Sequence, residues 1–301
     1  MPVPQLLYKI IYQKNINAIL RSINKGLQPI LPQKFRIPPS GQIMLATDSG
    51  NLKLSTNQTS YLTQLLFWNG YKNFEYSEIF ELLSKKVGSF LDIGSNIGYY
   101  SLLAAQANPK MEVYAFEPAL GPKYFLNENI RLNKFEKNIT SVDLALSNKI
   151  GEIDFYEVAN KKYRYLKYNL AGEGNAGTKK TSRNFVKNTV NATTLSQFIA
   201  SRNLKRIDLI KLDTEGTEFE ILMSGRADIQ LFEPIIICET LFNTIESKLE
   251  DFFSDLDYSF YNHTSSGLVK ASTLRRNSDD GIRNCFFVPK SKLALITPFI
   301  A

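Results

Sequence analysis

Four acidic residues lie at the ends of short apolar runs in this sequence, where strands would give way to turns. They are Asp92 in FLDIGSNIGYYS, Glu117 in VYAFEPA, and Asp213 and Glu215 in DLIKLDTEGTEFEIL. Acids at the carboxyl edge of a parallel sheet can accept hydrogen bonds from ribose hydroxyls or attract a cationic group. The pattern therefore predicts a nucleoside site at this edge.

The turn after Asp92 discriminates between nucleoside cofactors. A dinucleotide fingerprint requires G-x-G-x-x-G so that the backbone can approach a pyrophosphate, and here the middle position is Asn96, in Gly94-x-Asn96-x-Gly98. A carboxylate before this turn would repel phosphate, whereas it suits a cationic amino-acid group such as that of S-adenosylmethionine. The alternative interpretation is that these acids are simply solvated at strand ends. That interpretation explains either acid alone better than it explains the pair Asp92 and Glu117. A nicotinamide dehydrogenase is disfavoured by Asn96.

These acids require a sheet that brings strand ends together. From residue 87 onward, apolar runs alternate with amphipathic stretches, a pattern typical of β-α units around a parallel sheet. Strands are expected near 88–93, 111–117, 139–145, 207–213, 234–240, 257–262 and 283–289, with an additional strand at 151–158, and helices near 97–107, 120–133, 193–202, 216–225 and 244–254. We predict a Rossmann-like, doubly wound, mostly parallel seven-stranded sheet over residues 87–290, a tail at 291–301 and a long basic loop after residue 158.

Residues 1–86 are predicted to form a basic amphipathic extension that caps the substrate site. Leucine and isoleucine recur at helical spacing between residues 6 and 27, interleaved with Lys and Arg. A hairpin is expected at 41–55 and a helix at 75–86. A helix that packs its apolar face on the domain is one interpretation of the first segment. A helix of residues 1–40 that lies on an anionic membrane is the other.

Charge is distributed unevenly along the 301 residues, which carry a formal net charge of +7. Residues 1–40 contain basic residues and no acid, and residues 159–188 contain eight basic residues against Glu173, so the remainder is acidic. Basic segments can attract phosphates on nucleic acid, lipid or a nucleotide-sugar, and they are also typical of solvated surfaces. With no run of eighteen apolar residues and no secretory signal pattern, we expect a cytoplasmic location.

The few thiol and imidazole groups predict no metal site. Cys238 and Cys285 lie in apolar runs without metal-binding spacing, and His263 is the sole histidine. Buried thiols are expected rather than a disulfide or a zinc centre.

Residues 88–262 resemble the FkbM-type S-adenosylmethionine-dependent methyltransferases. The resemblance rests on FLDIGSNIGYYS, VYAFEPA, LNENIRLN, ALSNKIGEIDFYE, GNAGT and above all LIKLDTEGTEFEIL. It implies methyl transfer to oxygen, typically to a sugar or polyketide hydroxyl. It also implies that Asp92, Gly94, Asn96 and Gly98 line the methionine end of the cofactor, that Glu117 binds the ribose, and that Asp143 and Ala145 contact the adenine.

The resemblance further implies that Asp213 and Glu215 face the methyl-transfer centre. Because no histidine lies in these motifs, the candidate bases are carboxylates: Glu215 first, Asp213 second and Glu239, at the end of PIIICET, third. The same acids could hold a divalent metal, which the sequence does not support. Asn175, Gly177 and Thr178, followed by Lys179 and Lys180, are predicted to form a lid for the acceptor, and a disordered loop is the alternative. A lid with lysines would suit an acceptor that carries phosphate.

Two other functions remain as alternatives. An RNA methyltransferase is suggested by the basic segments and by Tyr163, Tyr165 and Tyr168 among lysines, although an Asn-Pro-Pro-aromatic motif is missing. We rank nucleic acid below a small-molecule or glycan acceptor. A non-catalytic module that binds a partner or membrane through its basic N-terminus is the second alternative, which the intact set of cofactor acids opposes.

Overall fold

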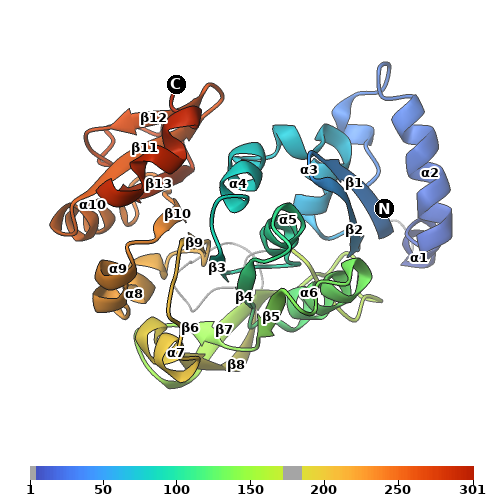
Figure 1. Cartoon of the computed structure of the whole chain (residues 1–301). Coiled ribbons are helices and arrows are strands. Elements are labelled where there is room, and N and C mark those ends of the chain that lie inside the picture. Colours follow the sequence, from blue (N-terminus) through green and yellow to red (C-terminus); the bar gives the residue numbers. More distant parts are fainter. Residues whose placement is uncertain (1–4, 172–184) are drawn as a thin grey trace.

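The computed structural model describes residues 5–171 and 185–301, and its central element is a mixed β-sheet (Figure 1). Within the described residues this sheet has eight strands in the order β12-β11-β13-β10-β9-β3-β4-β5. The strands are β3 (Ser89–Ile93), β4 (Glu112–Phe116), β5 (Ile139–Val142), β9 (Leu209–Leu212), β10 (Ile235–Glu239), β11 (Tyr258–Thr264), β12 (Gly267–Ala271) and β13 (Asn284–Pro289). Strands β5, β4, β3, β9 and β10 are parallel, and β13, β11 and β12 are attached antiparallel.

The predicted Rossmann-like fold is confirmed, and all seven predicted core strands are present. Every residue of β3 and β9 is buried, because a parallel strand is covered by helices on both faces of the sheet. This burial explains why the runs SFLDI and LIKL are mostly apolar, with Asp92 and Lys211 as the buried charged exceptions. Strand β12 adds an eighth strand that the sequence pattern did not indicate, since only one of its five residues, Leu268, is buried.

Helices cover both faces of the sheet (Figure 1). The first face packs against α4 (Ser77–Ser84), α5 (Tyr99–Ala107) and α6 (Leu120–Asn133), and the second against α7 (Leu195–Ser201), α8 (Glu218–Met223), α9 (Arg226–Phe232) and α10 (Glu246–Asp255). Alternating side chains of one strand enter the two cores: Ile235 and Ile237 lie in the first, and Ile236 in the second. The short helix α11 (Leu293–Ile296) adds Ile296 to the first core.

A three-stranded sheet in the order β6-β8-β7 lies beyond β5. It consists of β6 (Ala145–Leu146), β7 (Gly151–Val158) and β8 (Phe185–Thr193). The additional strand predicted at 151–158 is confirmed as β7. Strand β8 lies where a long loop was expected. Most of its residues are polar and are not buried, so its own sequence pattern did not indicate a strand. Its antiparallel pairing with β7 determines its conformation.

The N-terminal segment begins with α1 (Gln5–Ile11) and α2 (Lys14–Gly26) and continues through the hairpin of β1 (Gly41–Thr47) and β2 (Gly50–Thr56) into α3 (Tyr61–Asn69). The predicted hairpin is confirmed. Its buried residues Leu52 and Leu54 lie in the first core, together with residues of α4 and α5. The hairpin therefore packs against the main sheet's helices. No helix of the described residues is both long and apolar enough to span a bilayer.

Helix α2 contacts the rest of the protein through polar side chains. Its buried residues are Asn17, Arg21 and Asn24, whereas Ile19 and Ile23 are 62% and 58% exposed. The interpretation that this segment packs its apolar face on the domain is therefore wrong. The amphipathic pattern is real, and its apolar side faces solvent.

Candidate functional site

The turn between β3 and α5 bends sharply through left-handed backbone conformations. Gly94, Asn96 and Gly98 have φ angles of 77°, 51° and 84°. Asparagine tolerates this region better than most residues that carry a Cβ. Asn96 can therefore take the left-handed conformation of this turn although it carries a side chain. The backbone N–H groups of Gly94 and Ser95 both donate to the carbonyl of Phe116 at the end of β4, at 3.1 and 3.0 Å, which joins this turn to the next strand end.

Glu117 connects the two turns through its carboxylate. Its two oxygens accept hydrogen bonds from the backbone N–H groups of Asn96 and Ala119, both at 2.9 Å. Burial raises the pKa of Glu117 to about 8, against the opposing effect of the N–H bonds from Ala119 and Asn96. The side chain is thus fixed at the edge of the cavity described below.

The third motif forms a tight turn after β9. Glu215 and Gly216 have φ angles of 61° and 109°, and the buried Glu218 accepts hydrogen bonds from the N–H groups of Thr214 (2.8 Å) and Gly216 (3.0 Å). Glu218 therefore closes the turn and orients Glu215. The role of Glu218 was missed in the sequence because an acid in the first turn of a helix is common for dipole reasons alone.

The turns after β3 and β9 are in direct contact. The N–H of Asp213 donates to the carbonyl of Ile93 at 3.1 Å, and a Cβ at Gly94 would lie 1.9 Å from the carbonyl oxygen of Asp213. Only glycine allows this approach. It occurs between β3 and β9, where the strand order reverses and open α/β sheets bind ligands.

A buried lysine lies beneath these turns. The Nζ of Lys211 is 3.2 Å from Asp213 and 3.9 Å from Asp92. Burial lowers the pKa of Lys211, but the carboxylates of Asp213, Asp92 and Glu75 outweigh burial and raise it above its usual value. Lys211 therefore stays an ammonium that holds the strand ends together. It was overlooked in LIKLD, although a lysine inside a buried strand needs such partners.

A cavity of about 370 Å³ opens at these strand ends. Ile93, Phe116, Leu146, Phe155 and Leu170 contribute apolar walls. Its ionisable groups, apart from tyrosine, are the six acids Glu75, Glu117, Glu157, Asp213, Glu215 and Glu239 and the single base Lys211. The described lining is thus strongly acidic, and it favours a cationic ligand over a phosphate-bearing one. Glu75, to which the Tyr100 hydroxyl donates at 2.7 Å, carries no signal in the sequence.

The predicted site residues fall into three groups. Gly94, Asn96, Glu117, Ala145, Asp213, Glu215 and Glu239 line the cavity. Asp92, Gly98 and Asp143 do not. Asn175, Gly177 and Thr178 lie outside the described residues, as do Lys179 and Lys180.

Asp92, Gly98 and Asp143 lie outside the cavity lining for different reasons. The Asp92 carboxylate is buried behind the turn, where it accepts from the N–H and the hydroxyl of Ser101 at 3.1 and 2.6 Å. Gly98 precedes α5 and packs against Leu126. The Asp143 side chain is 70% exposed and pairs with Lys123 at the surface. Direct contact of these three residues with a cofactor remains a prediction.

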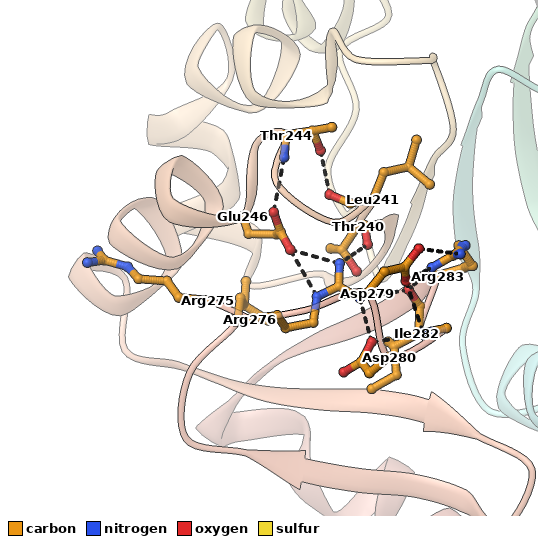
Figure 2. A network of polar contacts seen from close by, with 12 residues as sticks. Thr240, Leu241, Thr244, Glu246, Arg275, Arg276, Asp279, Asp280, Ile282 and Arg283 are labelled. Atoms are coloured by element: carbon orange, nitrogen blue, oxygen red, sulfur yellow. Dashed lines mark hydrogen bonds and ion pairs between the residues drawn. The ribbon is translucent and has the colours of Figure 1, made fainter.

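A second cavity of about 200 Å³ adjoins the first, and both are lined by Glu215 and Glu239. Its other walls include Glu218, Leu241, Thr244 and Ile245. Figure 2 shows how Arg276 fixes this wall: its guanidinium donates to Glu246 at 2.9 Å and to the carbonyls of Thr240 (2.6 Å) and Ile282 (2.9 Å). The segment after β10 is therefore held rigidly against the segment before β13.

The thiol and metal predictions concern groups away from this cavity. Cys238 and Cys285 are buried free thiols that oppose each other on β10 and β13, and burial raises the pKa of both. Within residues 5–171 and 185–301, no three His, Cys, Asp or Glu side chains are grouped so that they could hold a metal ion.

The strand order and the acidic crevice at its reversal point define a Rossmann-like α/β protein with a ligand cavity at that point. The chain belongs to the family of the methyltransferase FkbM domain, whose family model matches residues 92–260. This match contains all three motif turns.

Several known proteins are similar to this chain. It is 27% identical over 173 residues to the methyltransferase sdnD of Sordaria araneosa, covering 50% of this chain and 67% of that protein. It is 27% identical over 160 residues to the 2-O-methyltransferase NoeI of Sinorhizobium fredii, covering 50% of this chain and 63% of that protein. A crystal structure of methyltransferase FkbM from Methylobacillus flagellatus matches with a TM-score of 0.44 at 13% identity, over 67% of this chain and 43% of that chain.

Proposed function

We propose that this methyltransferase uses S-adenosylmethionine to methylate a hydroxyl group of a sugar, glycan, glycolipid or natural product. The acidic cavity at the ends of β3, β4 and β9 carries this proposal. Six carboxyl groups against one lysine favour a ligand with sulfonium and ammonium charges, and they disfavour the pyrophosphate of a dinucleotide. The name of the relative NoeI, a 2-O-methyltransferase, supports oxygen as the methyl acceptor.

The residues of the cavity suit the parts of this cofactor. When bound, S-adenosylmethionine supplies an electrophilic methyl group. Glu117 is fixed where an ionised carboxylate can accept from two ribose hydroxyls. Ala145 and Leu146 offer apolar contact for the base, and Asp213 offers negative charge for the ammonium. The apolar walls exclude water from the methyl group.

The proton of the acceptor hydroxyl requires a base at the junction of the two cavities. Glu215 and Glu239 line both cavities, so either carboxylate can face a cofactor and an acceptor at once. Asp213 lines the first cavity and is not part of the described lining of the second. The geometry therefore supports Glu215 as the first candidate, and it favours Glu239 over Asp213 as the second.

The second cavity is our candidate for the acceptor subsite. Leu241 and Ile245 provide apolar contact and Thr244 a hydroxyl, which suits the mixed surface of a sugar or a polyketide. A phosphate-bearing acceptor, such as a nucleotide-sugar or lipid-linked glycan, is a proposal that depends on Lys179 and Lys180, outside the described residues.

RNA receives less support as the acceptor because the tyrosines of the basic segment are engaged within the protein. Tyr163 packs against Tyr8 and Tyr12, with ring centroids 5.2 and 5.5 Å apart. Tyr168 stacks on Tyr124 at 4.4 Å. Rings occupied in this way offer fewer free faces for bases.

Titration calorimetry tests the proposed cofactor. We expect the protein to bind S-adenosylmethionine and S-adenosylhomocysteine with micromolar affinity, and not to bind NAD. Glu117→Ala should weaken binding by about tenfold to a hundredfold, because it removes charge-assisted hydrogen bonds. Asp154→Ala, which removes an exposed acid of β7, should leave binding unchanged. Binding of NAD without S-adenosylmethionine would contradict the proposal.

The affinity should also depend on pH through Glu117. Its pKa is raised to about 8, so below pH 8 the carboxyl group holds a proton that must leave before it can accept from both ribose hydroxyls. The affinity for S-adenosylhomocysteine should therefore increase as the pH rises from 6 to 8, by at most about tenfold per pH unit, and level off above. Glu117→Gln should flatten this dependence. An affinity that falls over the same range would show that the protonated form binds.

A further inference from the structure

The two N-terminal helices expose seven aliphatic side chains, here called the aliphatic face. It consists of Leu6, Leu7 and Ile10 on α1 and Ile16, Ile19, Ile23 and Leu27 on α2. These side chains are 39–69% exposed, and Ile30, which follows, is 76% exposed. Contiguous exposed apolar surface of this kind marks a site of interaction with a protein or membrane.

The orientation of α2 is fixed by its polar side. The guanidinium of buried Arg21 donates to the carbonyls of Ser40 and Gln42, and the Asn17 amide oxygen accepts from the Ser40 N–H at 2.8 Å. Asn24 accepts from the N–H of Ile37 at 2.9 Å. Rolling the helix to bury its isoleucines would break these bonds and leave a buried charge unpaired. The exposure of the aliphatic face is therefore a property of the folded protein.

Helix α1 is attached in the same manner. Tyr8 and Tyr12 pack edge-on against Tyr163, and the amide of Gln5 donates to the carbonyl of Lys162 at 2.8 Å. Leu6 and Ile10 are one helical turn apart on the other side. Both helices thus use one side to bind the protein and leave the aliphatic side free.

The charged residues of the segment that carries the aliphatic face are all basic. Lys9, Lys14, Lys25 and Lys34 are exposed, and residues 1–40 contain no Asp or Glu. Exposed Lys161 and Lys162 lie next to α1, where Lys162 Nζ is 5.2 Å from the Tyr8 ring centroid. The surface therefore complements an anionic partner.

The composition distinguishes a lipid surface from a protein partner. Protein interfaces are enriched in aromatic residues and Arg and depleted in Lys. Leucine and isoleucine flanked by lysines are instead the composition of helices that lie in the interface of an anionic bilayer. We propose that α1 and α2 dock the protein peripherally on membranes that contain anionic lipid, with the aliphatic face inserted among the lipids.

Vesicle co-sedimentation of the full chain tests this proposal. Wild type should bind vesicles of phosphatidylcholine with phosphatidylserine, and bind pure phosphatidylcholine vesicles more weakly. Ile19→Glu/Ile23→Glu should lower the affinity for anionic vesicles by about tenfold or more, because both side chains lose apolar burial. Leu231→Glu, at a still more exposed aliphatic position (73%) on α9, is the control and should bind as wild type. High salt should weaken wild-type binding.

Two results would overturn the proposal: no binding of wild type to anionic vesicles, or binding that the double substitution leaves intact. Sedimentation velocity without lipid tests whether a second copy of the chain, rather than a membrane, covers the aliphatic face. A dimer that the double substitution dissociates would assign the face to self-association instead. Retained S-adenosylhomocysteine binding and melting temperature would show that the variants are folded. Membrane binding is measured without methyl transfer, so its failure is separate from failure of the proposed function.

Discussion

Gly94→Ala is expected to lower the free energy of unfolding by about 3 kcal/mol or more and to abolish cofactor binding. A Cβ at this position would lie 1.9 Å from the carbonyl oxygen of Asp213 and 2.9 Å from the carbonyl carbon. Both atoms belong to the backbone and cannot rotate away. The φ angle of 77° adds a conformational cost of about 1–2 kcal/mol for any residue with a Cβ. Separating β3 from β9 would relieve the clash and dismantle the cavity.

Gly281→Ala separates these two contributions. Gly281 has a φ angle of 82°, and a Cβ there would have no atom within 4 Å, so only the conformational cost applies. Urea denaturation of both variants gives the comparison, with calorimetry for cofactor binding. Equal losses of stability would mean that the Asp213 carbonyl moves freely, and that the contact between the two turns does not hold the site together.

Glu215→Gln is expected to reduce the turnover number by about a hundredfold to ten-thousandfold, because it removes a general base and retains the shape of the side chain. Glu215 lies at the junction of the two cavities, in the turn that Glu218 closes. Cofactor affinity should change little, since Glu117 and Gly94 are untouched. The measurement requires an acceptor found by screening sugars, glycolipids and polyketides for methyl uptake.

Two further variants rank the carboxylates. Glu239→Gln should lower the turnover number less than Glu215→Gln does. Asp213→Asn should also weaken cofactor binding, because it removes the carboxylate that lies 3.2 Å from the Lys211 Nζ. Wild-type turnover in both Glu215→Gln and Asp213→Asn would refute the assignment of the base to this turn.

The sheet and its ligand-binding edge could be predicted because the physical causes are local. A buried parallel strand requires a continuous apolar run, and such runs at β3, β9 and β10 are followed at once by acids and glycines. Asn96 could be identified as a departure from the dinucleotide fingerprint. That it would adopt a left-handed conformation, with a φ angle of 51°, follows from the fold around it.

The remaining features depend on contacts between distant residues. The apolar stripe of α2 indicates a helix, but only Ser40, Gln42 and Ile37 determine that its polar side is bound. The partner of Lys211 on β3, Asp92, is likewise remote in sequence. Pairing with β7 creates β8 from a polar segment. No local pattern contains this information.

The order of the strands separates two tasks along the chain. Gly94, Glu117 and Ala145, which line the first cavity, belong to the turns after β3 and β4 and to β6, whereas the described lining of the second cavity lies between Glu215 and Ile245. Evolution can therefore change the two at different rates. Changes in the loop after β10 can alter the proposed acceptor subsite, whereas the turn after β9 packs against Gly94 and also lines the first cavity. A lineage built on this sheet can acquire new substrates while it inherits one chemistry.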